Sequence, residues 1–175
     1  SWDGFSVSQL GSDIDGEAAG DHFGFSVSLD SEGVRQAVGG NQNDANGAHT
    51  GHVRVFSWDG SSWSQLGSDI DGETGSNLFG YSISLDSDGD KVAIGGPRNG
   101  GTASDAGHVR VYSWNGSSWS QLGSDIDGEA SGDQLGSSVS LDSDGNRVAI
   151  GARFNDGTAS NAGHVRIYEY SSSSW

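Results

Sequence analysis

Cysteine and methionine are both absent from this chain, and proline occurs once. Without cysteine, the protein can have neither a disulfide framework nor a thiolate metal site, and its redox compartment stays open. Because position 1 is Ser and no methionine follows, we expect a processed, excised or partial product of a longer chain, with any signal peptide already removed. No apolar stretch approaches the roughly 18 residues that a membrane helix needs, and membrane insertion is not expected.

Positive charge is also scarce. Eight Lys and Arg residues stand against 24 Asp and Glu residues, which gives a formal net charge of −16. Phosphate backbones need clustered positive charge, and we therefore expect no nucleic-acid partner. High charge with only 32% hydrophobic residues is typical of disorder on composition alone. The apolar residues, however, gather in short β-branched or aromatic runs between Gly, Asp, Asn and Ser, which indicates many short strands and tight turns.

A period of 56 residues, the step from Ser57 to Ser113, runs through the chain. The segment SWDGSSWSQLGSDIDGE opens at Ser57, recurs from Ser113 with one substitution, and appears in altered form from Ser1. The tetrapeptide Gly-His-Val-Arg keeps the same step at 51–54, 107–110 and 163–166. An unbroken period of this length is typical of stacked or radially arranged units, each too small to bury its own apolar surface.

Each unit contains four strand candidates. In the second unit, Gly80–Leu85 alternates apolar and small polar residues, Asp86–Asp90 turns, and Lys91–Gly95 runs back. His108–Trp114 forms the third strand, and after an Asn-Gly turn the segment from Ser118 leads the fourth. Asp-Gly and Asn-Gly between such runs are strong hairpin signals. The pattern predicts an all-β, β-propeller-type tandem repeat, with three four-stranded antiparallel blades of 56 residues completed by another subunit or by a longer chain.

Two short motifs mark the first and second strands of every unit. The first strand opens with Phe23-Gly24, Phe79-Gly80 or Leu135-Gly136. The second strand ends with Val38-Gly39-Gly40-Asn41, Ile94-Gly95-Gly96-Pro97 or Ile150-Gly151-Ala152-Arg153. This order resembles the FG-GAP repeats of integrin-like β-propellers, whose blade runs from a Phe-Gly strand to a Gly-Ala-Pro ending. The resemblance covers essentially the whole chain and implies a propeller used for extracellular binding or adhesion.

The repeat boundaries predict one repeat domain with an open last unit. It divides into an outer strand with an acidic loop that completes a neighbouring blade, two full repeats and an incomplete one, at 1–22, 23–78, 79–134 and 135–175. Three blades are too few for a ring, since propellers use about four to eight. We expect self-association, either as a dimer that closes six blades, with Ser6–Leu10 completing the partner's open blade, or as a head-to-tail filament. A window on a longer array is the remaining alternative.

An acidic turn separates the first two strands of each unit, where the FG-GAP family often carries a calcium loop. Asp86, Asp88 and Asp90 are the candidate calcium ligands, because calcium takes six to eight hard oxygens. The turns are short and no closing carboxylate follows them. A hairpin turn with solvated acids is therefore the favoured interpretation, and a calcium site is the alternative.

A second acidic segment, Asp-Ile-Asp-Gly-Glu, recurs from Asp13, Asp69 and Asp125. Alternation along a strand places its three carboxylates on one face and Ile on the other. Such carboxylates repel one another unless cations or backbone donors intervene. Divalent ions or basic partners could supply this neutralisation, but the favoured interpretation is an outer strand whose charge prevents edge pairing.

Tryptophans recur in pairs, Trp58 with Trp63 and Trp114 with Trp119. These rings could stack sugars between blades and make the chain a multivalent lectin. The favoured interpretation is that they fill gaps between blades. Asn115 opens a single N-glycosylation sequon, usable only along a eukaryotic secretory route.

Nothing in the sequence indicates catalysis. Paired carboxylates recur identically in every unit, whereas catalytic sites usually need one asymmetric arrangement of differently tuned groups. A propeller would hold the equivalent His52, His108 and His164 far apart, and no nucleophile motif or phosphate loop is present. We therefore predict a non-catalytic extracellular or cell-surface scaffold for adhesion or filament assembly through multivalent protein or glycan contacts. A lectin with sites between blades is the alternative.

Overall fold

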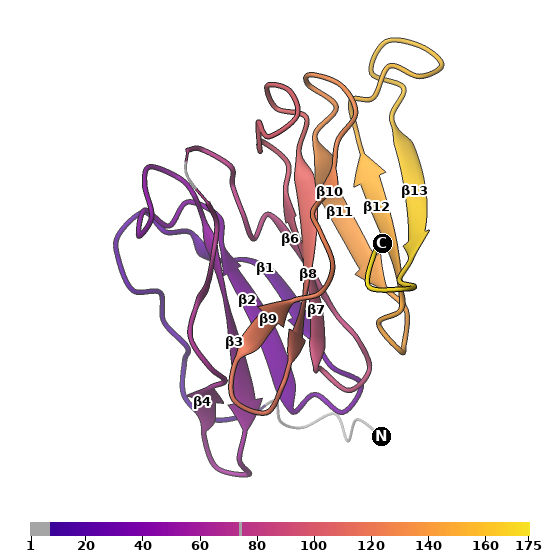
Figure 1. The fold of residues 1–175 in the computed structure, drawn as a ribbon. Coiled ribbons are helices and arrows are strands. Elements are labelled where there is room, and N and C mark those ends of the chain that lie inside the picture. Colours follow the sequence, from indigo (N-terminus) through magenta and orange to yellow (C-terminus); the bar gives the residue numbers. More distant parts are fainter. Residues whose placement is uncertain (1–7, 74) are drawn as a thin grey trace.

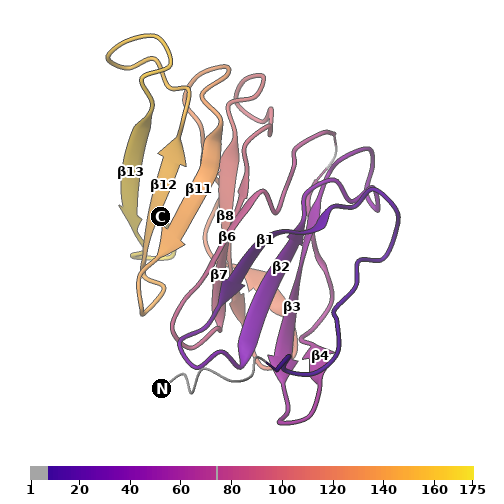
Figure 2. The same ribbon diagram turned by 180° about the vertical axis from the view of Figure 1, so that it is seen from behind.

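The computed structural model describes residues 8–73 and 75–175. These residues form strands and turns and no helix. They build three antiparallel sheets that stand side by side in chain order (Figure 1), and the view from behind shows the same arrangement (Figure 2). The described chain has no helix with the length and hydrophobicity needed to cross a membrane. The predicted all-β, blade-like architecture is confirmed.

The first sheet has the spatial order β1-β2-β3-β4, with β5 pairing farther along β3. Its strands are β1 (Phe23–Leu29), β2 (Arg35–Gly40), β3 (His52–Trp58), β4 (Trp63–Gln65) and β5 (Ile70–Asp71). The fourth strand predicted for each unit is therefore split into two pieces, both of which pair with the third strand. The acidic segment supplies the second piece.

The second sheet repeats the first. It contains β6 (Ser82–Leu85), β7 (Lys91–Gly96), β8 (His108–Trp114), β9 (Trp119–Gln121) and β10 (Ile126–Asp127). Strand β8 pairs with β7 on one side and with β9 and β10 on the other. Its bounds are those predicted from the sequence.

The third sheet has the order β11-β12-β13. Its strands are β11 (Leu135–Leu141), β12 (Arg147–Ala152) and β13 (His164–Glu169). Within residues 8–73 and 75–175, no strand pairs with the outer edge of β13. The third sheet therefore has three strands among the described residues, and the predicted repeat boundaries stay a prediction.

The hairpins between first and second strands are closed by their leading aspartates. Asp86 Oδ1 accepts hydrogen bonds from the backbone N–H groups of Asp90 at 3.0 Å and Lys91 at 3.1 Å. Asp30 and Asp142 do the same in the other two sheets. Each carboxylate thus satisfies donors that the tight turn leaves without a ladder partner.

The apolar core lies between neighbouring sheets. One cluster joins the first sheet to the second and contains Ala37, Val53, Val55, Ile70, Phe79, Leu85, Val92 and Ile94. The other joins the second sheet to the third and contains Ala93, Val109, Val111, Ile126, Leu135, Val148, Ile150 and Ala152. Because each cluster draws on two units, no unit can bury its own apolar face alone.

Glycine allows the backbones of adjacent sheets to touch. Gly107 has a φ of 81°, and a Cβ there would lie 2.1 Å from the carbonyl oxygen of Leu135. Leu135 N donates to Ala106 O across this contact at 2.9 Å. Gly51 approaches Phe79 in the same way at the first junction. Only a residue without a side chain fits these two places.

The N-terminal segment lies against the first sheet without joining it. Ser8–Leu10 form no strand, and the other two residues of the strand predicted over Ser6–Leu10 fall outside the described residues. Leu10 O accepts a hydrogen bond from Trp63 Nε1 at 3.0 Å. Leu66 O accepts the equivalent bond from Trp119 Nε1 at 2.8 Å. The N-terminal segment therefore contacts the first sheet through Trp63, in the same way that the segment around Leu66 contacts the second sheet through Trp119.

Replacing Ile94 by Ala should lower the free energy of unfolding by about 2–5 kcal/mol, because it removes a fully buried side chain and leaves a cavity. Urea unfolding followed by circular dichroism measures this loss. The exposed Val34→Ala change should stay within about 0.5 kcal/mol of the wild type. Equal losses in the two variants would contradict a core placed between the sheets.

Candidate functional site

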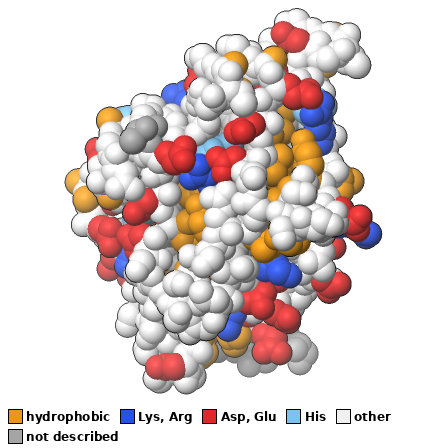
Figure 3. All heavy atoms as spheres, viewed as in Figure 1, with side chains coloured by type: hydrophobic (Ala, Val, Ile, Leu, Met, Phe, Trp, Pro, Cys, Tyr) orange, Lys and Arg blue, Asp and Glu red, His pale blue; other side chains and the backbone are white. Residues whose placement is uncertain are grey.

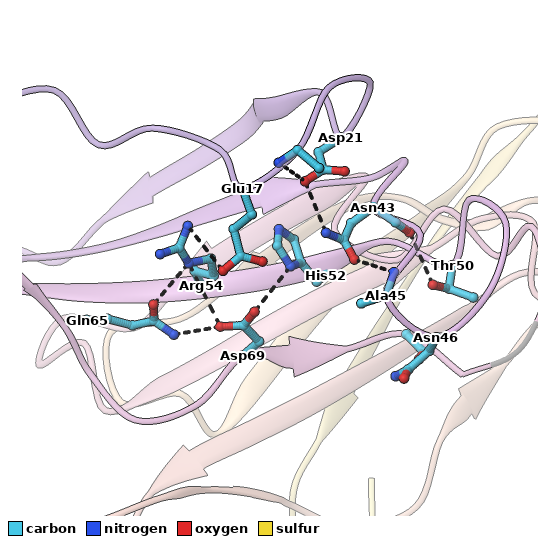
Figure 4. Close-up of polar contacts among 12 residues, drawn as sticks. Glu17, Asp21, Asn43, Ala45, Asn46, Thr50, His52, Arg54, Gln65 and Asp69 are labelled. Atoms are coloured by element: carbon cyan, nitrogen blue, oxygen red, sulfur yellow. Dashed lines mark hydrogen bonds and ion pairs between the residues drawn. The ribbon is translucent and has the colours of Figure 1, made fainter.

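A polar cluster recurs beside each junction, and Figure 4 shows its first copy. His52 Nδ1 lies 3.5 Å from Asp69 Oδ2, and Arg54 Nε lies 3.8 Å from Asp69 Oδ1. Gln65 bridges the two by accepting from Arg54 Nε at 3.0 Å and donating to Asp69 Oδ1 at 2.6 Å. Glu17, from the N-terminal segment, approaches Arg54 to 3.9 Å.

Strand alternation brings these groups together. His52 and Arg54 lie on one face of β3, whereas Val53 points to the opposite face and into the core. The pairing of Ile70 with Val53 aligns β5 beside β3 and sets Asp69 next to the basic side chains. The same residues that build the core therefore position the polar cluster.

The second copy is the more tightly bonded of the two. Arg110 makes a bidentate contact with Asp125, at 2.9 Å through Nε and 2.7 Å through Nη2, and also contacts Glu73. Burial opposes the charge on Arg110, but hydrogen bonds to these two carboxylates outweigh it and raise the pKa of the guanidinium above its ordinary value. Asp125 and Glu73 are thus neutralised by an arginine, whereas the favoured interpretation of the sequence was an outer strand whose charge prevents edge pairing.

Two aspartates of the acidic segment have opposite shifts. Asp125 has a pKa held well below its ordinary range by the imidazole of His108, with further lowering by Arg110 and Gln121. Burial raises the pKa of Asp127, and the charge of Asp125 raises it further. Asp71, the equivalent of Asp127 in the first sheet, has a raised pKa because of burial and of neighbouring Asp69.

The buried histidines lack hydrogen-bond partners for both ring nitrogens in the described part of the chain. His108 Nδ1 lies 3.6 Å from Asp125 Oδ2, longer than an ordinary hydrogen bond. Its ring meets the edge of Phe79 at a centroid distance of 5.8 Å. His52 has the same environment in the first sheet, with its ring against Phe23. This burial was not predicted from the sequence, because a histidine at the start of a strand carries no apolar signal of its own.

The cluster also gathers metal-ligating atoms. Ligand atoms lie within 4.8 Å of one another in two groups, one of His108, Asp125 and Asp127 and one of Glu17, His52 and Asp69. Arg110 already contributes a positive charge to Asp125 through two hydrogen bonds. The donor set therefore fits an internal ion pair better than a resident cation.

The third copy is partial. Arg166 Nη2 lies 2.5 Å from Glu129, as Arg110 contacts Glu73 in the second copy. No carboxylate in residues 8–73 and 75–175 stands beside His164 and Arg166 where Asp125 stands beside His108 and Arg110. This copy is open on the side of β13 that has no neighbouring strand.

A groove lies next to the cluster at the first junction. Its volume is about 350 Å³, and its lining includes Ser68, Asp69, Asp71, Tyr112 and Trp119. We call these residues the inter-blade groove. A second groove lies between the N-terminal segment and the first sheet, where Val27 and Val38 line it. Four of its residues, Ser12, Asp13, Ile14 and Trp63, correspond to residues of the inter-blade groove one repeat earlier.

The predicted tryptophan ligands lie in pairs of tilted rings beside these grooves. Trp114 and Trp119 have ring centroids 5.4 Å apart, and Trp58 and Trp63 are 5.3 Å apart. Trp119 also packs on the apolar core, and its Nε1 donates to Leu66 O. The nitrogen is thus engaged within the fold, while one ring of each pair lines a groove. Sugar binding by these rings stays a prediction.

The predicted calcium ligands lie in the β6–β7 turn. Asp86 is buried, and its Oδ1 already accepts the two backbone bonds that close the turn. Burial raises its pKa, and Asp90 raises it further against the opposing effect of Lys91. Asp88 is exposed at the tip. Calcium binding by Asp86, Asp88 and Asp90 stays a prediction.

The predicted glycosylation site lies in the β8–β9 hairpin. Asn115 is exposed, and its Oδ1 accepts from the backbone N–H groups of Ser117 at 2.9 Å and Ser118 at 3.0 Å. Its Nδ2, the atom that a glycan would modify, donates to Ser118 Oγ at 3.0 Å. Modification at Asn115 stays a prediction.

Comparison with known protein families assigns one unit directly. Residues 125–168 match the family model of the FG-GAP repeat. These residues are similar to an FG-GAP repeat. This match confirms the family resemblance inferred from the strand motifs, which in these residues read Leu135-Gly136 and Ile150-Gly151-Ala152-Arg153. It covers the junction between the second and third sheets together with most of the third.

A solved structure shows the same architecture. A protein of Bacteroides uniformis ATCC 8492, named as a candidate 6-phosphogluconolactonase, is similar with a TM-score of 0.54 and 12% sequence identity. The similarity covers 83% of this chain and 36% of that one. At this identity the likeness concerns the fold alone. No curated protein sequence matches this chain.

Replacing Arg110 by Ala should destabilise the protein by about 1–3 kcal/mol, because Asp125 and Glu73 lose their charged donor in a partly buried site. Arg147→Ala removes an exposed ion pair with Glu169 and should cost less than about 1 kcal/mol. Thermal unfolding of the two variants measures the difference. Similar midpoints would show that the cluster contributes no more than a surface pair.

Replacing Asp127 by Asn should raise the unfolding temperature at pH 7. A carboxyl whose pKa is higher in the folded state binds more protons there, and its ionisation weakens the fold as pH rises. The gain should disappear near pH 3, where the aspartate is protonated in both states. Asp88→Asn, in the β6–β7 turn, is the control for the same change in net charge. A gain of equal size at both pH values would contradict the electrostatic origin.

Proposed function

We propose that this FG-GAP chain is a non-catalytic scaffold that acts outside the cell, at a surface, through multivalent contacts with proteins or glycans. The observation that carries the proposal is the repetition of the inter-blade groove beside a polar cluster whose charges are paired within the fold. Repeated equivalent grooves suit multivalent binding, in which several weak sites on one surface together give a high overall affinity. The adhesive role that the FG-GAP resemblance implies agrees with this arrangement.

The absence of catalytic activity is part of the proposal. An enzyme needs acid and base groups that face a substrate and differ from one another in pKa. The carboxylate with the lowered pKa, Asp125, is bonded to Arg110 and therefore has little freedom to take up a proton. The repeated geometry also supplies no single asymmetric centre.

The surface charge points to proteins or glycans and away from nucleic acids. Acidic side chains are spread over the face in Figure 3, and basic ones lie beside them. Most arginines described above are engaged with carboxylates, among them Arg54, Arg110, Arg147 and Arg166. Little free positive charge is left for a phosphate backbone.

Cells that display the chain on their surface should adhere to wells coated with a panel of extracellular matrix proteins and glycans. Adhesion should rise more than in proportion to the number of displayed chains, because linked weak sites add through effective concentration. Ser68→Arg places a long side chain in the inter-blade groove and should reduce adhesion at least tenfold. Ser120→Arg, at an exposed position of β9, is the matched control. No adhesion to any member of the panel would overturn the proposal.

A multivalent lectin is the second candidate. The inter-blade groove combines an aromatic ring with carboxylates and hydroxyls, a combination that suits the apolar face and the hydroxyl groups of a sugar. Binding to a glycan array that Trp119→Ala abolishes and Trp119→Phe retains would favour this candidate. Adhesion to proteins with an empty glycan array would exclude it.

A further inference from the structure

The outer face of the third sheet exposes apolar side chains that the internal junctions bury. Val165 and Ile167 of β13 are 69% and 72% exposed. The residues one repeat earlier, Val109 and Val111, are 0% and 1% exposed because the third sheet covers them. The side chains at this end are therefore apolar, like those of the internal cores, but no sheet of the described residues covers them.

The opposite end of the stack, at the first sheet, exposes the other apolar face that an internal junction would contain. Val27 and Leu29 of β1 are 67% and 59% exposed. Their equivalents one repeat later, Ile83 and Leu85, pack against the apolar core of the first junction. Each internal core joins a β13-type face to a β1-type face, and the two ends of this chain carry one of each.

We propose that a second copy of this chain docks head to tail on these faces, so that two chains close a ring of six blades. Six is the one multiple of three within the four to eight blades that propellers use. The ring would contain two identical new junctions related by a twofold axis, so no apolar face would remain uncovered. The internal junctions serve as templates for both, and the inference does not depend on the adhesive function.

Hydrogen bonds of the internal junctions have free counterparts at the ends. Ser26 Oγ donates to Gly80 O at 2.6 Å, and Ser82 Oγ donates to Gly136 O at 2.8 Å. The third serine of this series, Ser138, is exposed on β11. In the ring it would donate to the Gly24 carbonyl of the second copy.

In the ring, the N-terminal segment of the second copy supplies the neighbour that β13 lacks among the described residues. Leu66 N donates to Val55 O, and Leu122 N donates to Val111 O, both at 2.7 Å. Leu10, the equivalent of Leu66 and Leu122, is 53% exposed. In the ring, Leu10 of the second copy would bond to Ile167 and cover the open edge of β13.

The same docking completes the third polar cluster. His164 and Arg166 face Glu129, but among the described residues no carboxylate takes the place that Asp69 and Asp125 have in the first two copies. Asp13 occupies that position in the repeat and belongs to the N-terminal segment. Asp13 of the second copy would therefore pair with Arg166 across the new junction.

Light scattering of the 175-residue chain should give one species of about twice 18.0 kDa, with or without calcium. The double variant Val165→Arg/Ile167→Arg should be a monomer with an unchanged far-ultraviolet circular dichroism spectrum. Ser64→Arg/Ser120→Arg adds the same charge on exposed positions of the outer strands and should remain a dimer. If the first variant fails to fold, Leu10→Arg tests the same junction from its other side.

A double-mutant cycle tests the completed cluster. Asp13→Ala and Arg166→Ala should each weaken dimerisation about tenfold, the effect expected for losing one charged hydrogen-bonded pair. The double variant should be no weaker than either single variant, because both remove the same contact. Additive losses would show that the two residues do not meet.

Three other results would overturn the proposal. A monomer of wild-type chain at high concentration would show that the end faces do not associate. Large polydisperse particles would show that the chains associate into an open filament and do not close a ring. A dimer that survives Val165→Arg/Ile167→Arg would place the interface elsewhere. None of these masses depends on adhesion, so a failed ring and a failed adhesion assay are told apart.

Discussion

The burial of apolar side chains between neighbouring sheets is the constraint on which the whole structure depends. A single unit has a small, glycine-rich sheet, and its Val and Ile side chains pair across strands but have no covering layer within that sheet. Phe79 and Ile94 become fully buried because the first and second sheets share one core. Stability in such an array is a sum over junctions, and each junction is also where the backbones come close enough to require glycine.

Beside each core, the ion pairs of the polar cluster connect the two sheets at the edge of the junction. Asp125 and Arg110 lie in one sheet, while Glu73 comes from the chain that leads toward it, so the ion pairs link successive units. Their charges offset one another locally in a chain of net charge −16. The inter-blade groove forms where this edge meets the paired tryptophans, which makes the surface a by-product of how the sheets are joined.

The sequence predicts the local structure well and the contacts between units poorly. Strand β8 follows from alternation and an Asn-Gly turn, both of which act over a few residues. The split into β9 and β10 does not follow, because it depends on how Gly123 passes the aromatic pair of Tyr170 and Trp175. The pairing of Arg110 with Glu73 spans 37 positions and depends on sheet geometry. The burial of His108 could not be predicted from the sequence either, because it also depends on how the sheets pack against one another.

The chemical sameness of the junctions has a consequence for how such a chain can change over generations. Unequal recombination within the coding sequence would add or remove whole 56-residue units, the step from Ser57 to Ser113. Every product would join its sheets through the same valine, glycine and arginine contacts, so no new interface would have to arise by point substitution. The number of blades can therefore vary more readily than the residues at the junctions. Which numbers of blades close into a ring then depends on the angle between successive sheets more than on the contacts between them.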